Sequence, residues 1–357
     1  MTELPAVPRY DQITAAWLGA ALARRGIDAR VADFSIETVG TGQLGETRRF
    51  HLRYAGTPPP EAPATLVGKF QSDNAVAATS GRDMGWYRSE VMFYRELAHR
   101  AGIHVPKAYV AEYDETSGHF ALLLEDMAPA TTGDHMQGCS VENARKALGE
   151  AARLHATFWN DAELEAQPWL YKPAGAQGFY TTELLESSWA HFQKTYSHLM
   201  DPQVMQVCDK FVRCHARWNA PRSAPKCFSH NDFRVDNMLF GGPRICVVDW
   251  QTSAWLGTGM DVSYFLGGAF DRATRRAVER DLLKEYLAEL QRLGVRDYDF
   301  EQLMADYRHY SFAVLVVAIA ATVVVKQTER GDRLFMKMVT DGAWQALDND
   351  AVDALPT

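Results

Sequence analysis

The sequence is poor in cysteine and has no excess of basic residues. Its five cysteines are scattered, and none lies in a Cys-x-x-Cys pair. This pattern predicts reduced intracellular thiols, most of which fill the core. The formal net charge of -8 lacks the basic surface with which nucleic-acid-binding proteins neutralise phosphates. We therefore expect no nucleic-acid partner.

Long apolar segments are also missing. The N-terminus shows no basic region followed by an apolar run, so the sequence predicts no secretory signal. The longest apolar run, Phe312 to Val325, would span about 21 Å as a helix, which is short of the ~30 Å hydrocarbon core of a membrane. It predicts a buried helix without a membrane span, and the expected location of the protein is the cytoplasm.

Length and composition predict a globular protein with two parts. A chain of 357 residues exceeds the size at which a single hydrophobic core usually stops growing. Its 47% apolar and 23% charged residues are ordinary globular values, so a sizeable core can form. We expect two domains or two lobes.

The N-terminal third has the pattern of a β-rich region. Alternating apolar and polar residues predict several strands. The expected strands are residues 33–39, 47–54, 65–70, 109–113 and 119–125. Helices are expected over residues 10–25 and 82–100. The first two strands enclose a turn that contains Gly40, Gly42 and Gly45.

Beyond a candidate hinge at residues 126–132, the composition changes to long helices. The expected helices with the clearest apolar period are residues 141–161, 272–293, 300–326 and 330–346. His155 lies on the apolar face of the first of them and is predicted to be a core histidine. Two charged clusters, residues 271–276 at a helix start and residues 348–350 near the C-terminus, are predicted to be exposed to solvent.

One polar stretch in the second part carries the chemistry. It reads His230-Asn231-Asp232-Phe233-Arg234-Val235-Asp236-Asn237, and the strand-like residues 244–248 then deliver Asp249. In the kinase pattern, an Asp that orients the acceptor hydroxyl precedes a Mg²⁺-binding Asn by five positions. Asp232 and Asn237 have this separation, although His-x-Asp is also a common chance tripeptide. A carboxylate that leaves an apolar strand must face a metal or be paired, and here the pattern favours the metal.

The N-terminal third supplies matching partners. In the same kinase pattern, a strand lysine reaches the phosphates and a glutamate on the following helix holds it, and Lys69 and Glu90 fit these roles. Taken singly, each has an ordinary alternative as a surface charge; their order relative to Asp232 favours the functional interpretation. Gly40, Gly42 and Gly45 are assigned to the nucleotide from their position alone, since glycines occur in any hairpin turn.

Together these residues resemble the aminoglycoside phosphotransferase and choline kinase family of small-molecule kinases. The resemblance is carried by His230-x-Asp232-x-x-x-x-Asn237, Asp249-Trp250-Gln251, Lys69 and Glu90. Residues 233–240 and 261–266 look closest to the bacterial ecdysteroid-kinase-like branch. The resemblance implies an α+β, bilobal protein-kinase-like fold, with a β-rich N-lobe at residues 1–127 and a mainly helical C-lobe at residues 128–357.

The resemblance also implies the cofactors and the role of each residue. It implies ATP, Mg²⁺ and a hydroxylated small-molecule acceptor. Asp232 is expected to act as base or orienter, Asn237 and Asp249 to bind Mg²⁺, Lys69 to hold phosphate, and Glu90 to position the lysine. The segment that holds Glu125 and Met127 is expected to meet the adenine through its backbone.

Some features leave alternatives open. Asn231 stands where the family usually has Gly, which restricts the backbone and suggests lower activity. Aromatic residues between positions 159 and 218 either line an apolar acceptor pocket or pack helices together. If they line the pocket, a hydroxyacyl or sterol-like alcohol is the expected acceptor. The alternatives are an aminoglycoside or macrolide kinase, and a nucleotide-binding pseudokinase scaffold.

Overall fold

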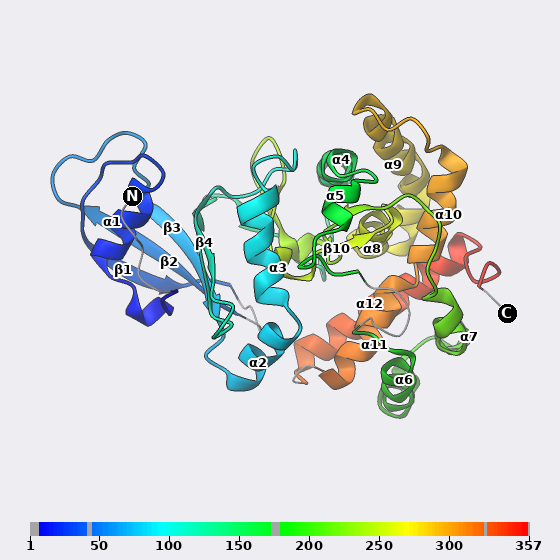
Figure 1. Ribbon diagram of the computed structural model, residues 1–357. Coiled ribbons are helices and arrows are strands. Elements are labelled where there is room, and N and C mark those ends of the chain that lie inside the picture. The colour runs from blue at the N-terminus through cyan, green and yellow to red at the C-terminus, as the bar shows by residue number, and fades with distance from the viewer. Residues whose placement is uncertain (1–6, 41–44, 173–178, 325–326, 356–357) are drawn as a thin grey trace. The chain divides into compact units, whose positions relative to one another are not determined.

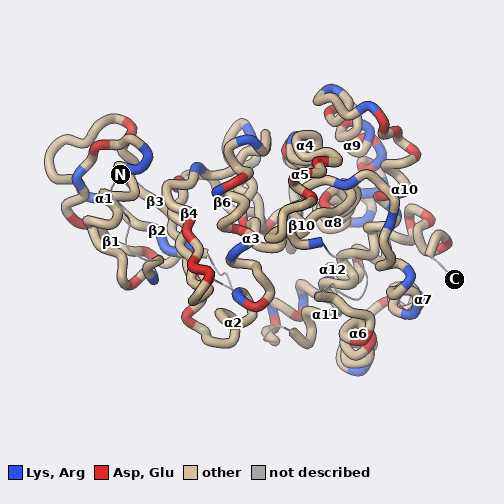
Figure 2. The backbone as a smooth tube through the Cα atoms, viewed as in Figure 1, with Lys and Arg blue, Asp and Glu red and all other residues tan. Residues whose placement is uncertain are grey.

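The computed structural model describes residues 7–40, 45–172, 179–324 and 327–355, and its chain divides into two compact units (Figure 1). The first unit comprises Met1–Arg100, Val105–Ala130 and Val247–Thr252; the second comprises Ala101–His104, Thr131–Cys246 and Ser253–Thr357. The expected boundary after residue 127 places residues 101–104 in the first part and residues 247–252 in the second part. In the structure, residues 101–104 belong to the second unit and residues 247–252 to the first. Acidic and basic residues are interspersed along both units (Figure 2).

The first unit is built on an antiparallel sheet of five strands in the order β1-β2-β3-β5-β4. The strands are β1 (Val31–Thr38), β2 (Gly45–Tyr54), β3 (Thr65–Gln71), β4 (Ala108–Tyr113) and β5 (Phe120–Glu125). Strands that follow each other in the sequence pair as antiparallel neighbours, β1 with β2 and β4 with β5. Every strand expected in this region is therefore confirmed.

Alternation along the strands assigns the two faces of this sheet. Helix α1 (Ala15–Ala23) packs on β1 and β4 over an apolar cluster that includes Leu123. Leu123 is paired with Gly68, whereas Lys69 is paired with Leu122. Because neighbouring residues of a strand point to opposite faces, Lys69 lies on the face away from that cluster.

The helix predicted over residues 82–100 is instead broken into several pieces. Helix α2 (Ala75–Asp83) ends before Gly85, whose φ of 70° is left-handed, and α3 (Trp86–Met92) starts directly after it. A π-helical turn, η2 (Phe93–Leu97), continues α3. Glycine adopts a positive φ without steric cost, so Gly85 allows the break that the apolar period alone does not reveal. Helix α3 packs on β4 and β5.

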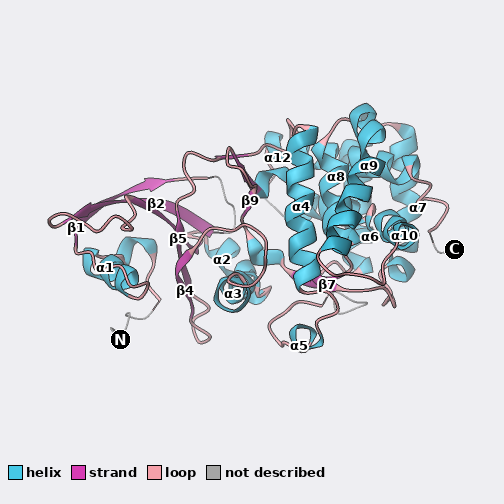
Figure 3. Ribbon diagram, turned by 90° about the horizontal axis from the view of Figure 1, so that it is seen from above, coloured by secondary structure: helices cyan, strands magenta, loops and turns pink. Residues whose placement is uncertain are grey.

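The second unit is mainly helical (Figure 3). Its helices are α4 (Val141–Thr157), α5 (Ala162–Glu165), α6 (Thr182–Tyr196), α7 (Pro202–Trp218), α8 (Gly259–Ala269), α9 (Arg272–Arg292), α10 (Phe300–Tyr310), α11 (Ala313–Val324) and α12 (Glu329–Asp348). Its core joins α6, α7, α8, α11 and α12. Short strands accompany the helices: β6 (Thr131–Thr132) pairs with β8 (Met238–Phe240), and β7 (Cys227–Ser229) pairs with β10 (Ala254–Leu256).

Helix α8 was not expected as a helix. Every one of its residues is buried, so it lacks the polar face that gives a surface helix its period. Only β9 (Cys246–Val247) is a strand within the expected residues 244–248. Both elements border the predicted catalytic residues.

The apolar run near residue 312 belongs to the helical core. By length and composition, Phe300–Val324 is long and apolar enough to cross a membrane, but 61% of its most apolar window is buried inside the protein. Eight residues of α11 are buried, and most of them belong to the core of the second unit. A packed core helix passes the same test of length and composition.

Both charged clusters that were predicted to be exposed are partly buried. Arg275, in α9, has 2% side-chain exposure and pairs with Glu279 at 2.9 Å. Asp348, at the end of α12, pairs with Arg275 at 2.5 Å and with Arg272 at 2.7 Å, and its side chain is 6% exposed. The two clusters lie far apart in the sequence but neutralise each other in the fold. The prediction of solvated charges was wrong at these positions.

Candidate active site

In the first unit, Lys69 stands between two carboxylates. Its Nζ lies 2.7 Å from Glu90 Oε2 and 2.8 Å from Asp249 Oδ1. Glu90 comes from α3, which covers the sheet face that presents Lys69. Burial lowers the pKa of Lys69, but the two carboxylates more than offset it, so the pKa is raised and the ammonium stays charged. Burial raises the pKa of Glu90, and Asp249 raises it further.

Asp249 is positioned by an unusual backbone and by its neighbour. Its φ of 68° is in the left-handed region, which few residues other than glycine adopt. The next residue, Trp250, is fully buried and stacks on Phe93 of η2, with ring centroids 3.7 Å apart. The stacked ring fixes the chain on one side, and a large share of the Asp249 carboxylate stays accessible, at 31% exposure.

The glycines of the first hairpin are placed in part. Gly40 has a φ of 75°, and Gly42 lies outside the described residues. Gly45 begins β2, where an added Cβ would lie 3.0 Å from the Phe70 carbonyl oxygen and 3.5 Å from Lys69 Cε. A side chain at position 45 would therefore be tight against the Phe70 carbonyl oxygen and in ordinary van der Waals contact with Lys69.

The segment expected to meet the adenine follows β5. The Glu125 N–H donates to the Lys107 carbonyl at 2.8 Å, and the Met127 carbonyl accepts from the Ala130 N–H at 2.9 Å. Between them, the buried Asp126 carboxylate accepts from Arg49 Nε at 2.7 Å. These bonds hold the short connector that leaves the sheet.

In the second unit, Asp232 and Asn237 meet directly. Asn237 Nδ2 donates to Asp232 Oδ2 and to the Asp232 carbonyl, both at 2.8 Å. A 3₁₀ turn, η5 (Val235–Asn237), closes the five-residue spacing and brings the amide back to the carboxylate. Because Nδ2 is the donor, Asn237 Oδ1 remains the acceptor of that side chain. The sequence spacing thus becomes a carboxylate and amide pair.

A buried carboxylate of α8 anchors this loop. Asp261 accepts the backbone N–H groups of His230 and Asn231, each at 2.8 Å. Its Oδ2 also lies 3.0 Å from His155 Nε2, and His155 Nδ1 lies 2.7 Å from the Tyr286 hydroxyl. A carboxylate only accepts, so the proton lies on Nε2 and Tyr286 donates to Nδ1. As predicted, His155 is a fully satisfied core histidine.

The backbone explains the identity of residue 231. Asn231 has a φ of 66°, a conformation in which Asn is one of the best-tolerated residues after Gly. Its N–H still reaches Asp261. The side chain that was expected to disturb the loop therefore occupies a conformation that suits it.

Arg234 lies between Asp232 and Asp236. Its Nε is 3.2 Å from Asp232 Oδ1, and its Nη1 is 3.3 Å from Asp236 Oδ2. Burial lowers the pKa of Arg234, but the two carboxylates more than offset it and raise the pKa. Asp236 also accepts the His135 N–H at 3.2 Å. His135 itself is buried, which lowers its pKa to about 3 and keeps it neutral.

Most of the aromatic residues between positions 159 and 218 pack helices. Trp189, Phe192 and Tyr196 of α6 are buried in the core of the second unit. Tyr180 differs, because it packs against this core and also interacts electrostatically with Asp232. Asp232 also contributes, after burial, to the raised pKa of Tyr264 in α8. Burial raises the pKa of both phenols, so both stay protonated.

The predicted ligands of Mg²⁺ provide suitable atoms. Asp249 offers a carboxylate and Asn237 an amide oxygen, and Mg²⁺ prefers such oxygens. Among the described residues, no three His, Cys, Asp or Glu side chains gather in a metal-binding group. Mg²⁺ in kinase-type sites is usually held by one or two carboxylates together with substrate phosphates, so each of the two side chains, taken by itself, offers an oxygen of the kind the ion binds.

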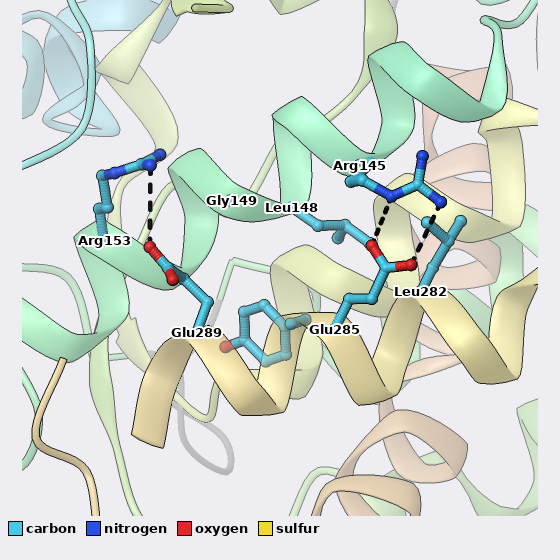
Figure 4. Close-up of a pocket in the computed structure, with 8 residues that line it drawn as sticks. Arg145, Leu148, Gly149, Arg153, Leu282, Glu285 and Glu289 are labelled. Atoms are coloured by element: carbon cyan, nitrogen blue, oxygen red, sulfur yellow. Dashed lines mark hydrogen bonds and ion pairs between the residues drawn. The ribbon is translucent and has the colours of Figure 1, made fainter. Parts of the chain in front are cut away.

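A groove of about 230 Å³ lies elsewhere on the second unit, between α4 and α9 (Figure 4). Arg145 pairs with Glu285 at 2.5 Å, and Arg153 lies 3.7 Å from Glu289. All four charged side chains of the groove are thus paired across the two helices. None of the predicted site residues lines it.

Sequence reasoning missed several residues of the site. Asp261 lies in the segment 261–266 that carries part of the resemblance, but its role was missed, since its helix is buried on every side and shows no amphipathic period. Arg234 and Asp236 had a readable signal, because a cation flanked by two acids at intervals of two residues can pair with both. Tyr264 had no signal separate from the core.

Comparison with protein families identifies a match over more than half of the chain. Residues 79–303 match the model of a group described as the phosphotransferase enzyme family. No curated protein matches the sequence.

Several solved structures share the fold. A Ralstonia eutropha protein named as a candidate aminoglycoside phosphotransferase is 15% identical, with a TM-score of 0.53, and the alignment covers 95% of this chain and 98% of that one. Choline kinase from Cryptosporidium parvum is 9% identical, with a TM-score of 0.55 and coverages of 94% and 92%. Choline kinase from Streptococcus pneumoniae is 15% identical, with a TM-score of 0.51 and coverages of 91% and 97%.

Proposed function

Because the chain belongs to the phosphotransferase enzyme family and has the kinase-like fold, we propose that it transfers the γ-phosphate of ATP to a hydroxyl group of a small molecule. The observation that carries the proposal is the Asp232 and Asn237 pair, held 2.8 Å apart on a loop that Asp261 anchors. A carboxylate and an amide in this relation are the two loop functions that phosphoryl transfer needs. Family membership supports a transferase, and the acceptor is our inference.

The chemistry assigns one role to each side chain. Asp232 takes the proton of the acceptor hydroxyl as its oxygen forms a bond to the γ-phosphorus. The bond between that phosphorus and the bridging oxygen breaks, and ADP leaves. Lys69, fixed by Glu90, holds the phosphates through its charge. Mg²⁺, to which we assign Asn237 Oδ1 and the Asp249 carboxylate, supplies neutralisation of the charge on the triphosphate.

The remaining nucleotide contacts are assigned to the first unit. We assign the adenine to the Glu125 carbonyl and the Met127 N–H. The Glu125 N–H is bonded to the Lys107 carbonyl, and the Met127 carbonyl accepts from the Ala130 N–H. An added Cβ at Gly45 would lie 3.5 Å from Lys69 Cε, and this nearness to the lysine supports a role for the turn at the phosphates.

We assign an apolar or acyl-type alcohol, such as a hydroxyacyl or sterol-like molecule, as the acceptor. Two protonated phenols, Tyr180 and Tyr264, interact with Asp232. The other carboxylate of the loop, Asp236, is occupied by Arg234. A polycationic antibiotic would need acidic partners, and the side chains around Asp232 named above provide few unpaired carboxylates for it. The five free thiols suit a reduced cytoplasm.

A two-step experiment tests the proposal. Thermal shift with MgATP measures nucleotide binding, and release of ADP is then followed over a panel of hydroxyacyl compounds, sterols, kanamycin and erythromycin. Turnover with hydroxyacyl or sterol-like compounds supports the proposal. Turnover with the antibiotics alone would show that the acceptor is an antibiotic and would refute the proposed apolar or acyl-type alcohol. Binding of MgATP without release of ADP with any acceptor identifies a nucleotide-binding scaffold and refutes the proposed activity.

A further inference from the structure

Arg234 is a charged residue that the proposed reaction does not use. We propose that Arg234 is a positioning residue, which holds the carboxylate of Asp232 in the orientation that phosphoryl transfer requires. The inference rests on the proposed function, because it assigns a task to Arg234 at the same site. It goes further in naming how the base is fixed.

The guanidinium reaches the base from one side. Arg234 Nε lies 3.2 Å from Asp232 Oδ1 and 3.3 Å from Asp232 Oδ2, so both carboxylate oxygens are within its reach. Asn237 Nδ2 donates to Oδ2 from within the 3₁₀ turn. Two donors on separate side chains leave the carboxylate little freedom to rotate, since each rotation would break a charge-assisted bond.

Arg234 is in turn held by a second carboxylate. Its Nη1 lies 3.3 Å from Asp236 Oδ2, which also accepts the His135 N–H at 3.2 Å. The segment before His135 lies tightly against the loop, because an added Cβ on Gly133 would come within 2.4 Å of Val235 Cγ1. The chain of contacts therefore runs from a packed loop, through Asp236 and Arg234, to the base.

The energetics of burial argue for a functional charge at this position. The Arg234 side chain is only 22% exposed, and a buried cation costs free energy that its ion pairs recover only with good geometry. Replacing a buried ion pair by an apolar side chain of similar size is often neutral for stability. A residue needed only for packing could therefore be apolar, whereas orientation of Asp232 requires the guanidinium.

The test compares three variants of the full chain in the hydrolysis of MgATP, with water as the acceptor. In this reaction Asp232 takes a proton from water, the water oxygen bonds to the γ-phosphorus, and ADP leaves. Arg234→Met removes the charge and keeps a side chain of similar size. Arg234→Lys keeps the charge but lacks the planar guanidinium group with its several N–H donors. Arg145→Met removes a matched arginine that pairs with Glu285 in the groove of Figure 4.

We expect Arg234→Met to remain folded and to lower kcat on the order of 10²-fold, because small misplacement of a catalytic group has that effect. The KM for MgATP should not change, since the lost interaction serves the transition state. Arg234→Lys should recover part of kcat, and Arg145→Met should match the wild-type chain. Circular dichroism measures the folded fraction of each variant.

Two results would overturn the inference while leaving the proposed function intact. The first is that Arg234→Met has the same kcat as the wild-type chain. The second is that kcat falls in both Arg234 variants only in proportion to the loss of folded protein. Failure of the proposed function is a separate result, in which the wild-type chain releases no more ADP than Asp232→Asn either with water or with any compound of the acceptor panel, and it removes both proposals.

Discussion

Asp261→Asn tests how the catalytic loop is anchored. In the wild-type chain, Asp261 Oδ1 accepts the Asn231 N–H, and Oδ2 accepts the His230 N–H and His155 Nε2. An asparagine has only one oxygen. If this oxygen takes the place of Oδ2, the amide nitrogen faces the Asn231 N–H, and two donors point at each other.

The cost follows from the number of unsatisfied groups. Each buried donor without an acceptor costs about 1–3 kcal/mol, and the substitution creates one on Asn231 and one on the new amide. We take about 3 kcal/mol as the loss in the free energy of local opening of the loop. Each 1.4 kcal/mol changes an equilibrium by a factor of ten, so amide exchange should speed up on the order of 10²-fold. The effect should be confined to the loop and its anchor.

Hydrogen exchange followed by NMR at the amides of His230 and Asn231 measures this opening. Asp348→Asn is the matched control, because Asp348 is also a buried carboxylate of the second unit but accepts from Arg272 and Arg275. The control should leave local exchange at both amides unchanged. Unchanged exchange in Asp261→Asn would refute the anchoring role of Asp261.

Other predictions concern the ion pairs and a buried glycine. Lys69→Met should lower turnover on the order of 10²-fold in an assay of ADP release, because a preorganised cation at the phosphates is lost. Gly268→Ala should lower the melting temperature by circular dichroism. The new Cβ would lie 2.1 Å from His135 Cε1, and this overpacking, about 1–3 kcal/mol, exceeds the gain of ~1 kcal/mol in helix propensity. Asp348→Asn should lower the free energy of unfolding by about 1–3 kcal/mol at pH 7. Burial raises the pKa of Asp348, but its arginine partners outweigh this and hold the pKa below its usual value. The stabilisation is therefore full above the unfolded pKa of about 4 and is lost as pH falls through the folded pKa, so chemical denaturation of the variant should lack this acid-dependent loss.

The sequence predicted the sheet of the first unit well, and two of its strands, β2 and β3, alternate between buried and more exposed residues. The five expected strands are present, and Lys69 and Glu90 meet at 2.7 Å. The break at Gly85 was missed, since an apolar period continues across a residue whose left-handed backbone turns the chain. A single glycine with a left-handed backbone can therefore interrupt a helix that the apolar period predicts to be continuous.

The predicted catalytic residues Asp232 and Asn237 could be recognised from the sequence because their spacing is local. Asp232 and Asn237 meet through one short turn, and local contacts follow from spacing. Asp261 could not be assigned in the same way, because its partners lie about thirty residues earlier, at His230 and Asn231, and its helix is buried on all sides. The pairing of Arg275 with Asp348 was lost for the same reason, since nothing in either cluster points to the other.

The most direct test of the account is ³¹P NMR of the full chain with MgATP and the hydroxylated panel, run beside Asp232→Asn. The account predicts a new phosphomonoester signal, formed as ADP accumulates, with the wild-type chain. It also predicts that the signal falls on the order of 10²-fold or more in the variant, as expected for loss of a general base. Equal formation of the phosphomonoester by Asp232→Asn would contradict the account. So would formation of ADP with inorganic phosphate as the only other product for every compound.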